Sequence, residues 1–196
     1  MKSQLVELED IFHDLLEVLG EDADRGGLLD TPLRAAKAWQ EWTAGYGQDP
    51  ADVLKVFDDG ATGYNGMVTV GNIPVFSHCE HHLAPFFGVA HIGYVPRDKV
   101  VGLSKLTRLV GIFANRLQIQ ERLTTQIAEA LQEHLNPEGV GVVIRCRHLC
   151  MESRGVRSTG STTTTSSLQG EFYDDAQTRS EFMRFVELAT LDKPHI

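Results

Sequence analysis

Two short clusters of thiol and imidazole side chains constrain the fold of this chain more than any other feature. The first is Cys79-Glu80-His81-His82, and the second, further along the sequence, is His148-Leu149-Cys150. A zinc ion bound by three of these side chains would bring the two segments together and keep one coordination position open. The surplus histidines are then available to move protons. The pattern therefore favours metal-assisted hydrolysis over a closed structural site.

The spacing within each cluster suggests which side chains bind the ion. Cys79 and His82 are three residues apart, so a helical turn or tight loop would place them on the same side. The segment that ends at Cys150 has the composition of a buried strand, whose alternation puts His148 and Cys150 on one face. Cys150 can then complete a Cys2His set, with His148 beside the metal. Cys146 shares that face and is interpreted as a small buried hydrophobe.

Three other interpretations of these residues are weighed against this one. Cys79 and Cys150 can instead form a disulfide or remain two buried thiols. A closed structural zinc site needs a fourth ligand, which His81 or His148 can supply. The run His78-Cys79-Glu80 matches half of a zinc nucleobase deaminase signature, but the Pro-Cys-x-x-Cys half is absent, which argues against a deaminase.

Length and charge limit the classes of protein that fit. The chain has 196 residues, enough for one globular domain with a small appended arm. Its net charge of −9 disfavours nucleic acid and anionic membranes as partners. The start has no basic, apolar signal pattern, and no apolar run approaches about 18 residues, so we expect a cytoplasmic protein. Three cysteines then indicate a metal or free thiols before disulfides.

Hydrophobic periodicity predicts an α+β fold. We expect helices over about residues 3–19, 32–44, 104–115, 121–135 and 175–188, and strands over 67–76, 86–95, 140–150 and 162–172. Thr31-Pro32 resembles a capping residue followed by proline in a first turn. Residues 1–60 are predicted to form a helical arm and residues 61–196 the catalytic domain. The order of elements after the arm suggests an antiparallel sheet with helices packed on one face.

Weaker signals indicate an anion site and a base-reading site. Ser104, Lys105 and Arg108 share a face at a predicted helix start, where phosphate binds readily. Taken alone, these residues are better explained as an ordinary helix cap with solvated basic side chains. Gln120 and Glu121 open the next helix. Glu121 is either a complement to the helix dipole or a carboxylate that accepts hydrogen bonds from a guanine-like edge.

Taken together, the chain resembles the zinc-dependent GTP cyclohydrolase I family over roughly residues 26–188. The matching motifs are Gly27-Leu28-Leu29-Asp30-Thr31-Pro32, Cys79-Glu80-His81-His82, Val101-Gly102-Leu103-Ser104-Lys105-Leu106, Gln118 to Thr124, His148-Leu149-Cys150-Met151 through Arg154-Gly155-Val156, and Thr178-Arg179-Ser180-Glu181-Phe182. The resemblance implies a tunnelling fold and a toroidal homodecamer with active sites between subunits. It implies conversion of GTP and water to 7,8-dihydroneopterin triphosphate and formate, the first step of tetrahydrofolate or pterin biosynthesis.

The resemblance also implies a role for each matching residue. Zinc would be bound by Cys79, His82 and Cys150, and a zinc-bound water would attack C8 of the guanine. His81 and His148 would be the general acid–base pair. The implied guanine contacts are Gln120 and Glu121, and the implied triphosphate contacts are Ser104, Lys105, Arg108, Arg154, Arg34 and Lys37.

Two rival functions follow from the same residues. One is a zinc protein of this fold that binds a nucleotide or pterin without turnover, although such a protein has no need of His81 and His148 together. The other is a nitrile reductase-like member of the same fold, which requires a thiol nucleophile. His78, directly before Cys79, departs from the family pattern and is assigned no role.

Overall fold

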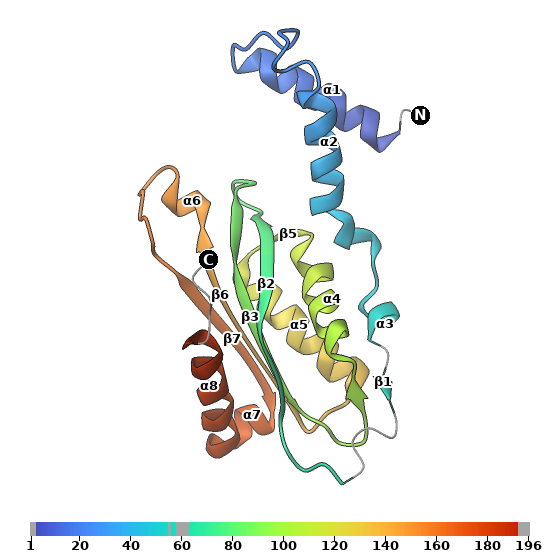
Figure 1. Cartoon of the computed structure of the whole chain (residues 1–196), viewed down its shortest axis with the longest axis vertical. Helices are drawn as coiled ribbons and strands as arrows, with labels where there is room; N and C mark the ends of the chain where they lie inside the picture. The colour runs from blue at the N-terminus through green and yellow to red at the C-terminus, as the bar shows by residue number, and fades with distance from the viewer. Residues whose placement is uncertain (1–2, 55, 58–62, 192–196) are drawn as a thin grey trace. The chain divides into compact units, whose positions relative to one another are not determined.

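The computed structural model describes residues 3–54, 56–57 and 63–191, and it divides into two compact units, Met1–Ala44 and Gly45–Ile196 (Figure 1). The predicted division into a helical arm over residues 1–60 and a catalytic domain over residues 61–196 stays a prediction. None of the helices in the described ranges is long and apolar enough to cross a membrane.

The first unit consists of two helices with little buried surface. They are α1 (Gln4–Val18) and α2 (Thr31–Trp42). Phe12 stacks on Trp39 with ring centroids 6.5 Å apart, which joins the two helices. The predicted start of α2 is shifted by one residue, because Thr31 is already helical and Asp30 occupies the capping position. Pro32 lies in the first turn, where its missing N–H costs no hydrogen bond.

A five-stranded sheet forms the centre of the second unit. In spatial order its strands are β5 (Leu117–Gln118), β2 (Val68–Cys79), β3 (Pro85–Val95), β6 (Gly139–His148) and β7 (Thr163–Gly170). All neighbours are antiparallel except the short β5, which is parallel to β2. In this register His78 pairs with Pro85, and Phe86 pairs with His148. Both thiol–imidazole clusters are therefore at the same end of the sheet.

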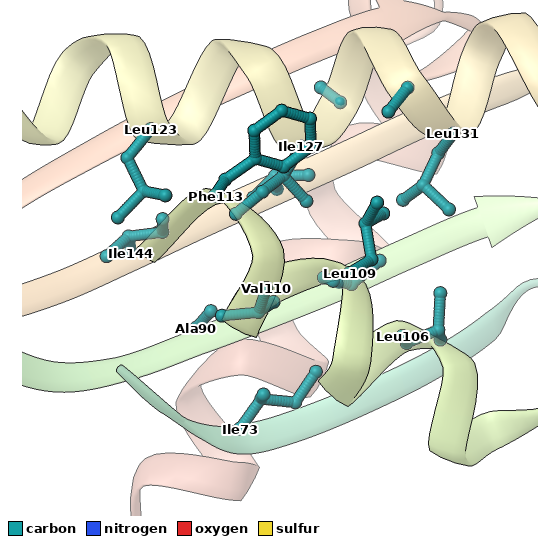
Figure 2. Packing of buried hydrophobic residues seen from close by; sticks show 14 of the residues in the cluster. Ile73, Ala90, Leu106, Leu109, Val110, Phe113, Leu123, Ile127, Leu131 and Ile144 are labelled. Carbon is teal, nitrogen blue, oxygen red and sulfur yellow. The ribbon is translucent and has the colours of Figure 1, made fainter. Parts of the chain in front are cut away.

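Two helices cover one face of this sheet and enclose the main hydrophobic core. They are α4 (Leu103–Ala114) and α5 (Gln120–Leu135). On α5, Leu123, Ile127 and Leu131 recur at intervals of four, so they form one apolar stripe that is fully buried. Figure 2 shows these side chains meeting Ile144 of β6 and Leu109 of α4. The position of α4 and α5 on this face agrees with the predicted layer of helices.

The C-terminal helices cover the opposite face of the sheet, whereas the sequence predicted a helix near residues 175–188 but placed all helices on one face. The C-terminal helices are α7 (Glu171–Asp174) and α8 (Ala176–Leu191). Phe172 and Phe182 are buried against the face formed by Gly93 and Gly141, which are register partners. A methyl group added at Gly141 would lie 2.5 Å from Phe172 Cδ1. The two glycines thus form a recess for the rings, and the helices occupy both faces of the sheet.

The remaining elements are short. They are η1 (Ala44–Gly47), α3 (Pro50–Val53), β1 (Val56–Phe57), β4 (Val100–Val101) and α6 (Leu149–Glu152), with β1 and β4 pairing as a separate small sheet. Two predicted strands end early. The strand predicted for 140–150 ends at His148, where α6 begins. The strand predicted for 162–172 ends at Gly170, whose positive φ of 57° turns the chain into α7.

Candidate metal centre and active site

Three side chains of the type that bind metal ions meet where β2 and β6 end. Cys79 is the last residue of β2, His82 lies in the turn that follows, and Cys150 lies in α6. One ligand atom from each lies within 4.8 Å of the others. The turn is closed by two hydrogen bonds, since the backbone N–H groups of His82 and Leu83 both donate to the carbonyl of Cys79. The predicted ligand set is thus brought together within a single chain.

The route by which Cys150 reaches this cluster differs from the prediction. Strand alternation was expected to place it beside His148, but α6 starts at Leu149, so a helical turn carries Cys150 to the cluster. Strand geometry does apply to His78, which precedes Cys79 on β2. Alternation directs His78 to the face opposite Cys79, and it is buried there. His78 is therefore no member of the three-donor group.

The donor set fits a divalent cation with a preference for sulfur and nitrogen. Burial raises the pKa of the Cys150 thiol, and the neighbouring Cys79 adds to that increase. A thiol whose ionisation is opposed in this way favours a nearby cation, because the cation stabilises the thiolate. Within the described residues all three cysteines are free thiols, so Cys79 and Cys150 form no disulfide. Neither His81 nor His148 belongs to the cluster as a fourth donor in that part of the chain.

His148 lies beside the cluster in a well-defined environment. Its ring stacks on Phe86, with centroids 4.7 Å apart and an interplanar angle of 10°. Its Nε2 is 2.8 Å from Oε1 of Gln120. Burial lowers the pKa of His148 below its usual value, and the carboxylate of Glu121 acts in the opposite direction. The imidazole is therefore fixed by contacts on its face and at one nitrogen.

Gln120 and Glu121, the two residues predicted to read the base, have different surroundings. Gln120 is 2% exposed, and its amide is hydrogen-bonded within the chain at both ends. Glu121 is exposed at the start of α5 and makes an electrostatic contribution at His148. Their contact with a base stays a prediction, but only Glu121 presents an accessible side chain.

The turn after β2 has an anchor that the sequence interpretation missed. Both carboxylate oxygens of Glu80 accept hydrogen bonds from Arg122 of α5, at 2.6 and 2.9 Å. This pair lowers the pKa of the Glu80 carboxyl, chiefly through the Arg122 hydrogen bond. It links the metal-binding turn to the helix that carries Gln120. His81 is exposed in the same turn, with its Nδ1 3.9 Å from Cys79 Sγ. No short-range motif could have revealed a pair so far apart in sequence.

The predicted phosphate contacts are divided between distant places. Arg154 is at the metal cluster, where its Nη1 is 3.3 Å from Nε2 of His82. The predicted contacts on α4 do not share that location. This helix starts close to Tyr94, because the N–H of Val101, just before α4, donates a hydrogen bond to Tyr94 Oη. Tyr94 and Phe86 lie at the two ends of β3. They are 8 residues apart, which at a rise of ~3.3 Å per residue is roughly 26 Å.

We call the two ends of the sheet the metal end and the basic end (Figure 1). The metal end comprises Cys79, His82, His148 and Cys150, and the basic end comprises Ser104, Lys105 and Arg108 at the start of α4. Arg34 and Lys37 are both exposed on α2 in the first unit. The roles of all six residues in phosphate binding stay predictions.

Comparison with known proteins agrees with this geometry. The family described as GTP cyclohydrolase I matches residues 8–187. GTP cyclohydrolase 1 of Janthinobacterium sp. (strain Marseille) is 64% identical over 169 residues, which are 86% of this chain and 85% of that protein. GTP cyclohydrolase 1 of Nitrosospira multiformis is 57% identical over 173 residues, covering 88% of this chain and 91% of that protein.

A solved structure, an archaeosine synthase QueF-like protein in its apo form, overlaps 53% of this chain and 93% of that chain, with a TM-score of 0.43 and 18% identity. The family match covers most of the chain and includes both clusters of the metal end. The predicted α+β class and the predicted hydrolase are confirmed. This chain belongs to the GTP cyclohydrolase I family.

Proposed function

We propose that this protein converts GTP and water into 7,8-dihydroneopterin triphosphate and formate, as the first step of tetrahydrofolate or another pterin pathway. The observation that carries the proposal is the open Cys79–His82–Cys150 cluster with His148 fixed beside it. A purely structural site has no use for an oriented imidazole next to its ligands. The cytoplasmic location expected from the sequence stays a prediction.

We infer that the cluster binds one zinc ion per chain. Two thiolates and one imidazole are ligands that zinc prefers, and three protein ligands leave room for a fourth. When bound, such an ion lowers the pKa of a coordinated water toward neutrality, so a nucleophile is available at working pH. Glu80 and Arg122 support the site by anchoring the turn between Cys79 and His82.

His148 and His81, which are not among the three donors, provide proton transfer. His148 is half-buried and His81 is exposed, so they can approach a substrate from the protein side and the solvent side. An imidazole titrates near neutral pH, which suits proton exchange with ring nitrogens and the ribose oxygen as the guanine imidazole ring and the sugar open. Hydrolysis at C8 releases formate, and ring closure then completes the pterin.

Substrate recognition is proposed to involve two copies of the chain. Glu121 offers an exposed carboxylate for the donor groups of guanine, and Arg154 offers a guanidinium for phosphate at the metal end. The start of α4 lies near Tyr94, at the end of β3 away from His148, which favours a contact between this segment and GTP bound by another copy. A neighbouring copy in a homo-oligomer, such as the expected homodecamer, would supply Ser104, Lys105 and Arg108 to the site.

The reaction is tested by incubating the purified protein with GTP. We expect formate, a fluorescent pterin after oxidation, and about one zinc ion per chain by elemental analysis. His148→Ala should retain zinc and lose turnover. A protein that binds zinc and GTP but releases no formate would contradict the proposal and favour the binding protein without turnover. Zinc loss in His148→Ala would make His148 a ligand.

The shared site is tested with mixed oligomers. Arg108→Ala and His148→Ala each impair one contribution to the proposed site. If different chains provide the two contributions, random co-assembly restores about a quarter of the sites to full composition. Activity should therefore reappear in co-expressed mixtures of the two variants. No recovery, with mixed oligomers confirmed by mass spectrometry, would place both residues at a site within one chain.

A further inference from the structure

A directed hydrogen-bond network surrounds the side chain of Gln120. The two hydrogens of its Nε2 are directed at three acceptors, so one hydrogen is shared: the carbonyls of Ile144 and Thr163, both at 3.0 Å, and Oγ1 of Thr165 at 3.1 Å. The opposite amide orientation would direct its oxygen at two carbonyl oxygens, which would repel it. The orientation is therefore determined by the network, and Oε1 of Gln120 faces His148.

Two threonine hydroxyls extend the network in a single direction. Oγ1 of Thr124 donates to the backbone carbonyl of Gln120 at 2.7 Å. Its hydrogen is thereby used, so in its 2.6 Å contact with Thr165 it must accept. Thr165 then donates to Thr124 and accepts from Gln120 Nε2. Each hydroxyl has one donor and one acceptor role filled, which leaves the Gln120 amide no freedom to reverse.

We propose that Gln120 is a positioning residue, which fixes the neutral form of His148 as the Nε2–H tautomer and leaves Nδ1 as the nitrogen that exchanges protons. The reason is that Gln120 Oε1, 2.8 Å from Nε2, only accepts hydrogen bonds. Nε2 therefore carries a hydrogen whether the ring is neutral or cationic. Proton transfer at Nδ1 then requires no rearrangement of the network. Phe86 stacks on the ring and restrains its rotation.

This assignment differs from the role of base reader that the sequence resemblance implied for Gln120. A residue that reads a base must offer unpaired donors or acceptors to it, and Gln120 is 2% exposed with its amide engaged at both ends. The catalytic use of Nδ1 rests on the proposed function, whereas the tautomer itself does not. The two can therefore fail separately.

The tautomer is tested in the full-length wild-type protein. Magic-angle-spinning NMR of protein with ¹⁵N-labelled histidine, at a pH where His148 is neutral, distinguishes the proton-bearing nitrogen from the bare one. The His148 signals are assigned by difference from His148→Asn. We expect Nε2–H and a bare Nδ1, both without metal and with zinc added. An Nδ1–H tautomer, or a zinc-induced change in which His148 becomes a ligand, would overturn the assignment, even for a protein that does not turn over GTP.

A variant pair separates positioning from base reading. Gln120→Leu should produce a mixture of His148 tautomers and lower kcat by about 10- to 100-fold, the usual range for losing a partner that orients a catalytic imidazole. The KM for GTP should change little. A raised KM with unchanged kcat and tautomer would instead assign Gln120 to the base.

Thr165→Val, a milder change for use if Gln120→Leu does not fold, should lower kcat by about 2- to 10-fold with unchanged KM. A raised KM would overturn the proposal here too. Thr125→Val is the control, since Thr125 is exposed on α5.

Discussion

The metal end and the basic end of the sheet differ in how completely one chain builds them. At the metal end, three donors lie within 4.8 Å of one another, and a buried network fixes the neighbouring imidazole. At the basic end, Ser104 and Arg108 are exposed, and Lys105 and Arg108 form no ion pair within the described residues. The difference teaches that one chain brings the three metal-type donors together, whereas the exposed basic residues of α4 have no such local partners among the described residues.

We expect the largest loss of activity from a substitution that removes a metal ligand. Cys150→Ala should reduce bound zinc from about one per chain to near zero. It should lower kcat by more than the roughly 10- to 100-fold typical of changing only an outer partner. Elemental analysis and the formate assay measure both. Cys146→Ala is the matched control, because Cys146 is a buried thiol of the main core outside the cluster. Full zinc occupancy in Cys150→Ala would remove Cys150 from the ligand set.

The next largest loss of activity is expected from a substitution at the basic end. Arg108→Ala should lower kcat/KM for GTP by about 10- to 100-fold, because a charge-assisted hydrogen bond to phosphate is lost. Zinc content and guanosine binding should not change. Arg184→Ala, an exposed arginine of α8, is the control. An equal loss for guanosine binding would show that Arg108 does not act on the phosphates.

A smaller effect is expected from the anchor of the metal-binding turn. Arg122→Met should weaken zinc binding by about 2- to 5-fold, since a partly exposed ion pair contributes little. Competition with a chromophoric chelator measures this. Glu80→Gln should have a similar effect, and the double variant should be no worse than either single one. Additive losses would indicate that the two residues act independently.

The smallest effect lies outside both ends and should change stability alone. Asp175 Oδ2 accepts hydrogen bonds from the Thr178 N–H and hydroxyl at 2.7 and 2.8 Å, and these bonds lower the pKa of Asp175. Asp175→Ala should lower Tm by about 2–4 °C at pH 7. Asp174→Ala, next to it and exposed, should have no such effect.

The same residue gives a pH dependence of defined sign. The folded pKa of Asp175 lies below the unfolded value, so its stabilisation is complete above the ordinary carboxyl pKa of about 3.9. It is lost as the pH falls through the lowered folded pKa. Thermal melts of Asp175→Ala and wild type should therefore converge at acid pH. A difference that persists after the carboxyl is protonated would contradict the hydrogen-bond explanation.

Much of the fold was predictable because its signals are local. Leu123, Ile127 and Leu131 repeat with helical period, and β6 carries an apolar run from Val140 to Ile144, so the types of these elements follow from local pattern. The end of β6 was not predictable, since the apolar pattern continues to Cys150 while the backbone turns helical at Leu149. The second helix layer was also missed, because nothing local in Gly93 or Gly141 indicates that aromatic rings lie above them.

The candidate site also has a part that was predictable from the sequence and a part that was not. Residue chemistry alone selected Cys79, His82 and Cys150, since few other roles require thiols and imidazoles at that spacing. The environment of Gln120 could not be predicted, because its helix-start position does not reveal that its amide points inward to His148. The Glu80–Arg122 pair likewise joins segments that only the folded chain brings together.

The recess beneath the C-terminal helices has a consequence for strand pairing. Gly93 and Gly141 belong to different strands, and they are side by side in one register only. A slip of β6 by one residue would place a valine, either Val140 or Val142, opposite Gly93 and fill the space taken by the rings of Phe172 and Phe182. The packing of α7 and α8 is therefore compatible only with the native register, because both rings require the two glycines to be aligned.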